Sequence, residues 1–567
     1  MLIFTGCSSD TLEEENLLEN EVANEDPIEE LQSEVEPLEI TDQDLDLSIR
    51  NGIWKNGVVS SAHPIASKIG VRILKKGGNA IDAAVGVSFA LGLLEPNASG
   101  PGGGGYMTVK MKGEEPTFID YRCVSPLSVD IEEYKALSKY ERENSIYSLA
   151  VPGAIDGWLR VHELYGVLDL DIILEDVIDI AENGFKVDSN LETMFIDNYG
   201  KISSDKEARI NFLNEEMPYL AGEVFKNKDY ADFLNIIINE GSDGFYKGTI
   251  AKKIIETVEE KGGWVDGEDL ENYESIVKEP LIGNYRNYDI ITSAPSSSGG
   301  VAIIESLNML EGFNLKELKI ESQKRLDLLA EVFRLANIDR YTYVGDSDDN
   351  NGIINKLMSK DYALERIENY NEETFMDLDP GILDKESEST THFSIIDKNG
   401  NGVSVTNTLG YFFGSATVVK GYGFFLNNQM YDFDISDWEK NNLEPNKRPR
   451  SSMSPTIITK DDEIISILGS PGGNKIPSTI VQVLVNIIDL DMNLVDAIQS
   501  PRVFINIDEN LILEKEFNIE NIERLRNKGY KISTVNDIGA VQGILKDENN
   551  KYQGVSDPRR GGKPYGY

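Results

Sequence analysis

Cysteine and histidine are scarce in this chain of 567 residues. There are two cysteines and three histidines, and the histidines stand far apart at His63, His162 and His392. None of them is accompanied by cysteine or by carboxylates at the spacing of a known ligand motif. We therefore predict no metal site.

Long hydrophobic runs are also missing. Apolar segments such as Ala83–Leu94 are too short and too often interrupted by glycine to span a bilayer, so no internal transmembrane helix is predicted. Residues 50–567 contain no internal repeat and no linker rich in proline, glycine or serine, which favours one large α/β body. Helical patterns are predicted at Ala66–Leu94, Lys252–Glu259 and Glu321–Arg340.

Lysine and arginine are absent from residues 8–49, which carry sixteen aspartates and glutamates. The whole chain has a formal net charge of −44, so −28 remains once these sixteen charges are subtracted. This balance argues against binding to nucleic acid, and against adhesion to anionic lipid by charge alone. Because such a composition is solvated and self-repelling, residues 8–49 are predicted to be a disordered acidic tether.

Residues 1–7, MLIFTGC, resemble the end of a bacterial lipoprotein signal in which Cys7 is lipidated. The alternative is a stray cysteine in a disordered leader. We expect an extracytoplasmic protein, either a cell-surface lipoprotein or a secreted one. With Cys7 modified, Cys123 has no partner, so no intramolecular disulfide is expected.

The most informative segment runs from Ser389 to Phe433. Two alternating strands, HFSII and VSVT, are joined by the turn KNGNG, which predicts a β-hairpin with threonine at its leading edge. A threonine hydroxyl is a weak nucleophile unless a base lies beside it. One such base is the threonine's own α-amine, freed by cutting the preceding bond, with a pKa of about 7.7–8.0. By pattern alone, however, threonine at a strand start is more often an ordinary β-former.

A glycine turn follows about forty residues further on. The strand pattern Glu463–Leu468 leads into GSPGG at Gly469–Gly473, and an apolar helix is predicted at Ser478–Leu490. This arrangement directs backbone N–H groups and a positive helix end to one point, which suits a phosphate or an oxyanion. A phosphate-binding loop requires Gly-Lys-Ser/Thr, and here Asn474 stands before Lys475, which excludes that motif.

A second glycine cluster lies at Gly102–Gly105, just ahead of the strand pattern Tyr106–Lys110. Glycine has no Cβ, so backbones can approach one another closely at such a position. We expect this cluster to be structural.

Taken together, these segments are similar to those of the γ-glutamyltranspeptidase family, N-terminal-nucleophile hydrolases that cleave themselves before a threonine. The likeness covers nearly all of the chain from about Gly57 to the C-terminus. Its motifs are VVSSAHPIASKIGVRILKKGGNAIDAAV, GPGGGGYM, DYR at Asp120–Arg122, TTH at Thr390–His392, NNQMYDF, PNKRPRSSMSPTI and GSPGG.

The resemblance implies an α+β fold, a four-layer αββα sandwich, made as one precursor. The precursor would be cut between Ser389 and Thr390 into a large subunit, residues 50–389, and a small subunit, residues 390–567, that form one body. The implied activity is that of a γ-glutamyltransferase and glutathione hydrolase. A γ-glutamyl ester on Thr390 would be passed to water or to the amine of an amino acid or peptide, and no cofactor is implied.

The resemblance also implies a role for each site residue. Thr390 would be the nucleophile, with the Thr408 hydroxyl supporting it, and Gly472 and Gly473 would form the oxyanion hole. The amino-acid end of the donor would be held by Arg122, Ser451 and Ser452 at its α-carboxylate, and by Gln429 and Asp432 at its α-ammonium group.

Two features set this chain apart within the family. Gly410 stands where the family usually has Asn or Glu, side chains that help to grip the donor's amino end. The segment Asp434–Glu444 is shorter than the loop that covers the glutamyl group in lidded members. The chain therefore resembles the lidless bacterial branch, which includes enzymes that act on poly-γ-glutamate.

Three alternative functions stay open. A related amidohydrolase or acylase for non-glutamyl amides would keep Thr390 and the glycines but could dispense with Arg122, Asp432 and the serine pair. A poly-γ-glutamate depolymerase would use the open cleft on a polymer. A non-catalytic surface-binding protein with this fold would remain a single uncut chain.

Overall fold

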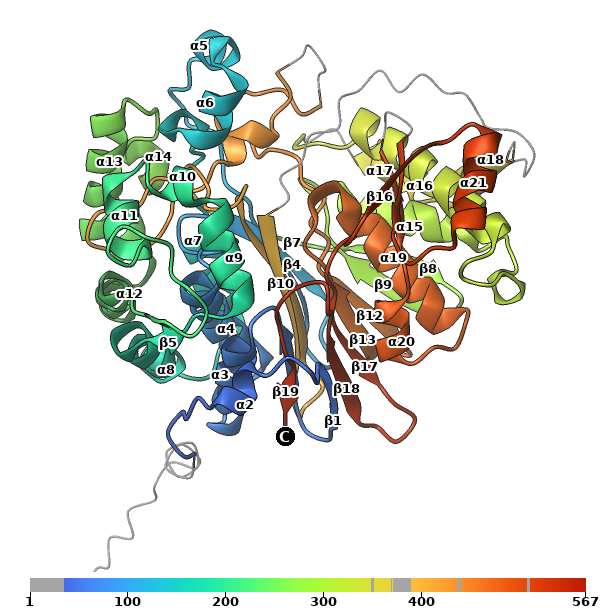
Figure 1. Cartoon of the computed structure of the whole chain (residues 1–567), viewed down its shortest axis with the longest axis horizontal. Helices are drawn as coiled ribbons and strands as arrows, with labels where there is room; N and C mark the ends of the chain where they lie inside the picture. The colour runs from blue at the N-terminus through green and yellow to red at the C-terminus, as the bar shows by residue number, and fades with distance from the viewer. Residues whose placement is uncertain (1–34, 348–350, 369, 371–388, 436–439, 507–509) are drawn as a thin grey trace, which may run out of the picture.

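The computed structural model describes residues 35–347, 351–368, 370, 389–435, 440–506 and 510–567. Cys7 and residues 8–34 of the predicted tether lie outside the described residues, as do residues 436–439 of the short loop. Figure 1 shows two β-sheets stacked face to face, with a layer of helices on the outer side of each. The expected four-layer αββα sandwich is confirmed.

Each sheet has seven strands, and all the pairings are antiparallel. The first sheet contains, in spatial order, β1 (Asn51–Trp54), β18 (Tyr552–Ser556), β17 (Gln542–Lys546), β13 (Glu463–Gly469), β12 (Thr456–Lys460), β9 (Tyr288–Thr292) and β8 (Leu281–Tyr285). The second contains β19 (Tyr565–Gly566), β2 (Val58–Ser61), β10 (Ser389–Ile396), β11 (Gly402–Gly410), β3 (Gly104–Lys110), β4 (Thr117–Tyr121) and β7 (Ile276–Lys278).

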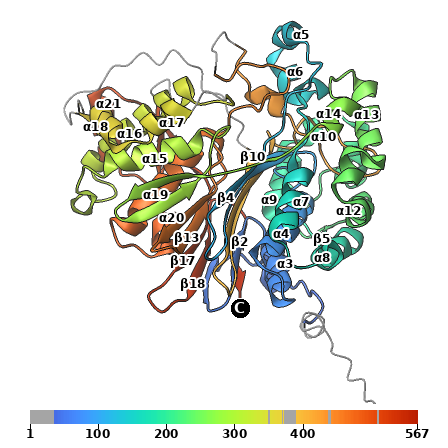
Figure 2. The same ribbon diagram turned by 180° about the vertical axis from the view of Figure 1, so that it is seen from behind.

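Between the sheets lies a cluster of branched aliphatic side chains contributed by both of them. It includes Val58 and Ile396 from the second sheet and Ile457, Ile467 and Ile544 from the first. Aliphatic side chains at alternating strand positions face the opposite sheet, so their burial fixes the register of both sheets. Figure 2 shows the same layers from behind.

The outer helical layers pack on these sheets through two large hydrophobic cores. The second sheet is covered mainly by α3 (Pro64–Lys75), α4 (Ala80–Leu94), α7 (Ala154–Tyr165), α8 (Leu170–Asn183) and α12 (Lys228–Tyr246). The first sheet is covered mainly by α15 (Gly299–Leu310), α16 (Gln323–Tyr343), α19 (Ile476–Ile488) and α20 (Leu494–Gln499).

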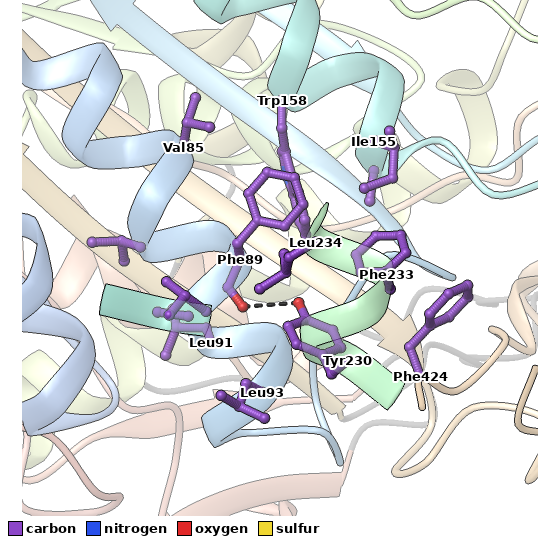
Figure 3. Close-up of a cluster of buried hydrophobic side chains, with 14 of the residues drawn as sticks. Val85, Phe89, Leu91, Leu93, Ile155, Trp158, Tyr230, Phe233, Leu234 and Phe424 are labelled. Carbon is purple, nitrogen blue, oxygen red and sulfur yellow. Dashed lines mark hydrogen bonds between the residues drawn. The ribbon is translucent and has the colours of Figure 1, made fainter. Parts of the chain in front are cut away.

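Helix α4 is apolar on all sides, and each of its residues is buried. A helix of this kind must be surrounded by other elements. Figure 3 shows Phe89 of α4 packed against Trp158 of α7, with the ring centroids 4.9 Å apart. The Tyr230 hydroxyl of α12 donates to the Phe89 carbonyl (2.9 Å), so the buried phenol is satisfied.

Most of the remaining elements are short. They are α2 (Asp42–Leu45), α5 (Ile131–Ala136), α6 (Lys139–Asn144), η1 (Ile146–Ser148), β5 (Phe185–Lys186), α9 (Ser189–Asp197), α10 (Tyr199–Ile202), α11 (Lys206–Phe212), β6 (Val224–Phe225), α13 (Thr249–Lys261), α14 (Gly267–Glu271), η2 (Leu315–Glu317), α17 (Asn351–Leu357), α18 (Lys360–Ile367), η4 (Gln429–Asp432), η5 (Gly473–Lys475), β14 (Val503–Ile505), β15 (Asn510–Glu514), α21 (Ile519–Lys528) and β16 (Lys531–Val535).

The single helical pattern predicted at Ala66–Leu94 is wrong, because the segment forms two helices, α3 and α4. Gly77 has φ +99°, a left-handed conformation that ends the first helix. Asn79 then caps the second, its side chain accepting from the N–H groups of Ile81 and Asp82.

The part of the predicted disordered tether that the structure describes contacts the body. Leu38, Ile40 and Leu45 pack against the core of the body. Leu45 is the last residue of helix α2. Asp44 is buried and forms an ion pair with Lys68 (3.0 Å). Among the helices that the structure describes, none combines the length and the apolar character needed to cross a membrane.

Candidate active site

Thr390 lies at the start of β10, in the middle of the second sheet. The β10–β11 pairing runs regularly from Thr391↔Asn407 to Ile396↔Gly402, but the register shifts between Ser389 and Thr391. Between these pairs β10 has one residue, Thr390, and β11 has two, Thr408 and Leu409, so β11 carries a β-bulge opposite Thr390, a feature that often redirects a side chain next to an active site. The residue is buried, and its hydroxyl donates to the Thr408 hydroxyl at 3.5 Å.

The Thr408 hydroxyl also contacts the bond that is predicted to be cut. It donates to the carbonyl oxygen of Ser389 and accepts from the backbone N–H of Gly410 (2.9 Å). A donor at this oxygen stabilises the negative charge that forms when a nucleophile attacks the carbonyl carbon. Thr390 and Thr408 are thus arranged around the Ser389–Thr390 bond itself.

Two charged residues that the sequence did not single out contact β10 at Thr390 and Thr391. The Arg560 guanidinium donates to the Thr390 carbonyl (2.6 Å), and Glu95 accepts from the Thr391 hydroxyl (2.6 Å). Burial raises the pKa of Glu95, while the Thr391 hydrogen bond and the charge of Arg560 oppose the rise. Arg560 thus holds the main chain at the candidate nucleophile, and Glu95 holds the side chain of the next residue.

A small cavity lies beside the Thr390 side chain. It brings together seven of the residues singled out from the sequence, although they come from distant segments. Its lining consists of Arg122, Thr390, Thr408, Asp432, Arg450, Ser451, Ser452, Met453, Gly473 and Ile476. Gln429 is not part of the lining; its side-chain amide donates to the Thr408 carbonyl (2.8 Å).

Arg122 and Asp432 form a buried ion pair with each other. Burial alone would lower the pKa of Arg122, but the Asp432 carboxylate reverses this effect, so the guanidinium stays charged. Arg122 Nε donates to the Pro449 carbonyl (3.2 Å), whereas Nη1 is buried and has no partner among the described residues. The two groups predicted to bind opposite charges of a substrate therefore neutralise each other here.

An arginine that was not predicted from the sequence contacts the serine pair. Arg340 of α16 donates to the Ser452 hydroxyl, and also reaches the Ser298 hydroxyl (3.2 Å) and the Asn474 carbonyl (3.5 Å). It links the serine pair to the glycine turn. Arg340 lies in a helix that the structure buries along almost its whole length. A charged residue at such a position needs polar partners, and this is the feature that points to Arg340.

The predicted strand–turn–helix around GSPGG is confirmed. Strand β13 ends at Gly469, η5 begins at Gly473, and α19 continues from Ile476. Gly472 has φ +128° and Gly473 has φ +57°, values that favour glycine. Because Gly473 and Ile476 line the cavity, the positive end of this helical segment faces it.

Gly410 also requires glycine. Its φ is +100°, and a Cβ atom there would lie 2.2 Å from the Asn428 side-chain oxygen. That oxygen accepts from the Tyr411 N–H (2.8 Å), and the Asn428 amide donates to the Glu143 carbonyl (2.7 Å). The carboxamide of Asn428 therefore occupies the place that a side chain at position 410 would enter.

No group of three or more His, Cys, Asp or Glu side chains suited to a metal ion occurs within the described part of the chain. The site thus consists of a hydroxyl nucleophile, a hydroxyl donor, a helix end and a buried cation–anion pair. These groups suit acyl transfer through an ester.

Two stacked antiparallel sheets between helical layers, with this threonine at the start of a central strand, define the fold of an N-terminal-nucleophile hydrolase. Cephalosporin acylase from Bacillus halodurans has the same fold, with a TM-score of 0.84 at 28% identity, covering 94% of this chain and 99% of that one.

The sequence comparisons define the family. The profile of gamma-glutamyltranspeptidase matches residues 66–567. The glutathione hydrolase proenzyme of Bacillus subtilis strain 168 is 37% identical over 540 residues, 91% of this chain and 92% of that protein. The capsule biosynthesis protein CapD proenzyme of Bacillus anthracis is 36% identical over 509 residues, 89% of each chain. The chain belongs to the gamma-glutamyltranspeptidase family.

Proposed function

We propose that this protein is a γ-glutamyltransferase with glutathione hydrolase activity, matured by its own cleavage before Thr390. The observation that carries the proposal is the contact set at this bond. One threonine hydroxyl lies next to another, which in turn donates to the scissile carbonyl. Membership of the family and the similarity to a glutathione hydrolase proenzyme support the same activity.

In maturation, Thr390 Oγ1 attacks the Ser389 carbonyl carbon, and the Thr408 hydroxyl stabilises the oxygen as it becomes negative. The hydroxyl proton passes to the amide nitrogen, and breakage of the C–N bond then leaves an ester between Ser389 and Thr390 Oγ1 and frees the Thr390 amine. Water then hydrolyses the ester, giving a carboxylate at Ser389. The freed amine is the base that accepts the hydroxyl proton in later turnovers.

In turnover, the same hydroxyl attacks the γ-carbonyl of the donor and the leaving amine takes a proton. The N–H groups of Gly472 and Gly473 at the helix end are proposed as donors to the oxyanion. Arg122, Ser451 and Ser452 would receive the donor's α-carboxylate, and Asp432 and Gln429 its ammonium group. On binding, the ion pair between Arg122 and Asp432 would be replaced by ion pairs of each residue with the oppositely charged group of the substrate.

Water or the amine of an amino acid or peptide would accept the glutamyl group. We also propose that the short loop admits donors that continue past the scissile bond, including poly-γ-glutamate, and that a lipid on Cys7 keeps the enzyme at the cell surface. Incubation with glutathione, γ-glutamyl anilides and γ-linked glutamate oligomers, with and without an acceptor dipeptide, measures this range.

An acylase for non-glutamyl amides is the second candidate, because a cephalosporin acylase shares the fold over nearly the whole chain. Arg122 and Asp432 favour the γ-glutamyl donor, since a buried ion pair beside the nucleophile matches both charges of an α-amino acid. If the activity on a glutaryl amide exceeds the activity on the matched γ-glutamyl amide, the protein is an acylase and not a γ-glutamyltransferase.

The proposal is tested by Thr390→Ala, which removes the attacking hydroxyl. We expect one uncut chain on a denaturing gel and no detectable glutathione hydrolysis. Thr391→Ser is the matched control, since it changes the neighbouring threonine but keeps its hydroxyl for Glu95; this variant should yield the small subunit that begins at Thr390. Cleavage or activity in Thr390→Ala would exclude the mechanism.

A further inference from the structure

The cavity beside Thr390 contains a second arginine to which the proposed function gives no task. Arg450 lines it together with Arg122 and is almost completely buried. Its Nη1 donates to the Tyr341 carbonyl (3.1 Å), and its guanidinium lies 4.5 Å from the centroid of the Tyr341 ring. Stacking on an aromatic ring orients a guanidinium without consuming its N–H donors.

The polar contacts of Arg450 are incomplete. Its Nε is buried and has no partner among the residues that the structure describes. The carboxylate that pairs with it is Asp434, at 3.4 Å from Nη2, and Asp434 retains 15% side-chain exposure. An unsatisfied buried N–H is unfavourable, and more so when it belongs to a charged group.

The cavity therefore holds two arginines that each have an N–H group without a partner, Arg122 Nη1 and Arg450 Nε. Arg122 has the role of binding the donor's α-carboxylate in the proposed function. One α-carboxylate can satisfy one bidentate guanidinium. Arg450 is thus a surplus cation, and it suits a second carboxylate close to the reacting bond.

We propose that Arg450 binds the α-carboxylate of the residue that follows the scissile amide, and that this is the preferred class of leaving group. The assignment rests on the proposed function. It favours γ-glutamyl amino acids and γ-linked glutamate oligomers, in which that carboxyl is free. In glutathione the corresponding carboxyl is part of a peptide bond and carries no charge.

The placement of the two arginines suits this class of substrate. Arg122 Nη2 lies 3.4 Å from the backbone carbonyl oxygen of Arg450, so the two residues are in direct contact where they line the cavity. In a γ-glutamyl amino acid the two α-carboxylates lie on either side of the scissile amide. Thr390 lines the same cavity as both arginines.

Asp434 acts as the competitor of the substrate in this arrangement. It belongs to the short loop, where its N–H donates to the Asn441 carbonyl (3.0 Å), and Asn441 accepts from the Arg450 N–H (2.8 Å). A long, partly exposed ion pair is weak and is exchanged at little cost for a substrate carboxylate. Removing its charge should therefore strengthen binding of the anionic leaving group.

The test compares γ-glutamyl-leucine with γ-glutamyl-leucinamide, which differ only in the charge of that carboxyl. In the wild-type enzyme kcat/KM should be higher for the acid. Arg450→Met should lower the acid-to-amide ratio about tenfold, Arg450→Lys should retain part of the preference, and Asp434→Asn should raise the ratio. Lys420→Gln, which removes an exposed positive charge elsewhere, controls for the overall field.

A ratio that Arg450→Met and Asp434→Asn both leave within twofold of wild type would overturn the assignment, as would a fall in the ratio in Asp434→Asn. If Arg450→Met does not fold, Arg450→Lys and Asp434→Asn decide. An uncut wild-type chain that is inactive on both substrates would overturn the proposed function, and with it this assignment. An active enzyme with an unchanged ratio overturns the assignment alone.

Discussion

The two glycine clusters of this protein look alike in the sequence but need glycine for different physical reasons. At Gly102–Gly105 the requirement is space. A Cβ atom on Gly102 would lie 2.2 Å from the Phe425 carbonyl oxygen, and one on Gly103 would lie 2.4 Å from the Thr408 carbonyl oxygen. The cluster lets β3 and the chain before it pack directly against neighbouring backbone.

At Gly469–Gly473 the requirement changes along the cluster. Gly469 needs space, since a Cβ there would lie 2.1 Å from the His392 ring, whereas Gly472 and Gly473 need their positive φ angles. Of the glycines in this cluster, Gly473 lines the cavity beside Thr390, and Gly472 directly precedes it. We therefore expect a glycine cluster to serve chemistry when it sets the direction of backbone N–H groups, and packing when it removes a side chain.

Gly472→Ala provides the largest effect that separates the two clusters. An alanine at φ +128° is strained by roughly 1–3 kcal/mol, and relief of the strain turns the N–H groups of the turn away from the oxyanion. One such donor is worth about 10²–10³ in kcat, so glutathione hydrolysis should fall by that factor. Expressed as free energies, the loss of activity should exceed the loss of stability obtained from Tm. A variant with full activity would show that this turn does not form the oxyanion hole.

Gly102→Ala should give the opposite pattern. The added methyl group meets backbone that cannot rotate away, and overpacking of this kind typically costs about 1–3 kcal/mol. We expect a clear fall in Tm, measured by thermal unfolding of the cleaved enzyme, and a smaller effect on kcat/KM. Loss of activity without loss of stability would contradict the structural role of the first cluster.

Arg122→Lys changes a side chain that is proposed to bind the donor's carboxylate, whereas Gly472→Ala changes the direction of backbone N–H groups. Lysine keeps the positive charge for Asp432 but cannot bind a carboxylate in the bidentate manner of a guanidinium. KM for the γ-glutamyl donor should rise about tenfold, which corresponds to about 1.4 kcal/mol, with a smaller change in kcat. An unchanged KM would place the donor's carboxylate elsewhere.

Local features of the site could be predicted from the sequence because neighbouring residues determine them. The β10–β11 hairpin follows from strand alternation and an Asn-Gly turn, and the strand–turn–helix follows from glycine between a strand and an apolar helix. The predicted acidic tether, residues 8–49, shows that composition alone does not predict where a disordered segment ends. Its charge predicted disorder up to residue 49, but three aliphatic side chains are enough to dock its end on the core.

Contacts between distant segments could not be predicted in this way. Arg340 and Ser452 lie 112 positions apart, and Arg560 and Thr390 lie 170 positions apart, so no spacing rule links them. Arg122 and Asp432, 310 positions apart, were assigned to the two opposite charges at the amino-acid end of a substrate, and the ion pair between them is visible only in the fold. The sequence therefore identified groups of the site but not the network that positions them.

His392, whose ring packs on Gly469 of the second cluster, makes the stability of the protein depend on pH. Burial lowers the pKa of His392 to about 3, whereas an unfolded histidine titrates near 6.5. Between these values the unfolded state binds a proton that the folded state does not, so stability is lost as the pH falls below about 6.5. One such group contributes at most about 1.4 kcal/mol per pH unit.

His392→Gln should therefore flatten the pH dependence of stability while it lowers stability at pH 7. The glutamine can still hydrogen-bond to Thr406 and Ser394, the partners of the histidine, but it does not titrate. Urea unfolding of the uncut Thr390→Ala precursor at pH 7, 6 and 5 measures this, with and without the second change. His63 is also buried with a lowered pKa, and it contributes equally to both proteins. Parallel curves would show that His392 is protonated in the folded state, and that the packing of its ring on Gly469 does not exclude the charged form.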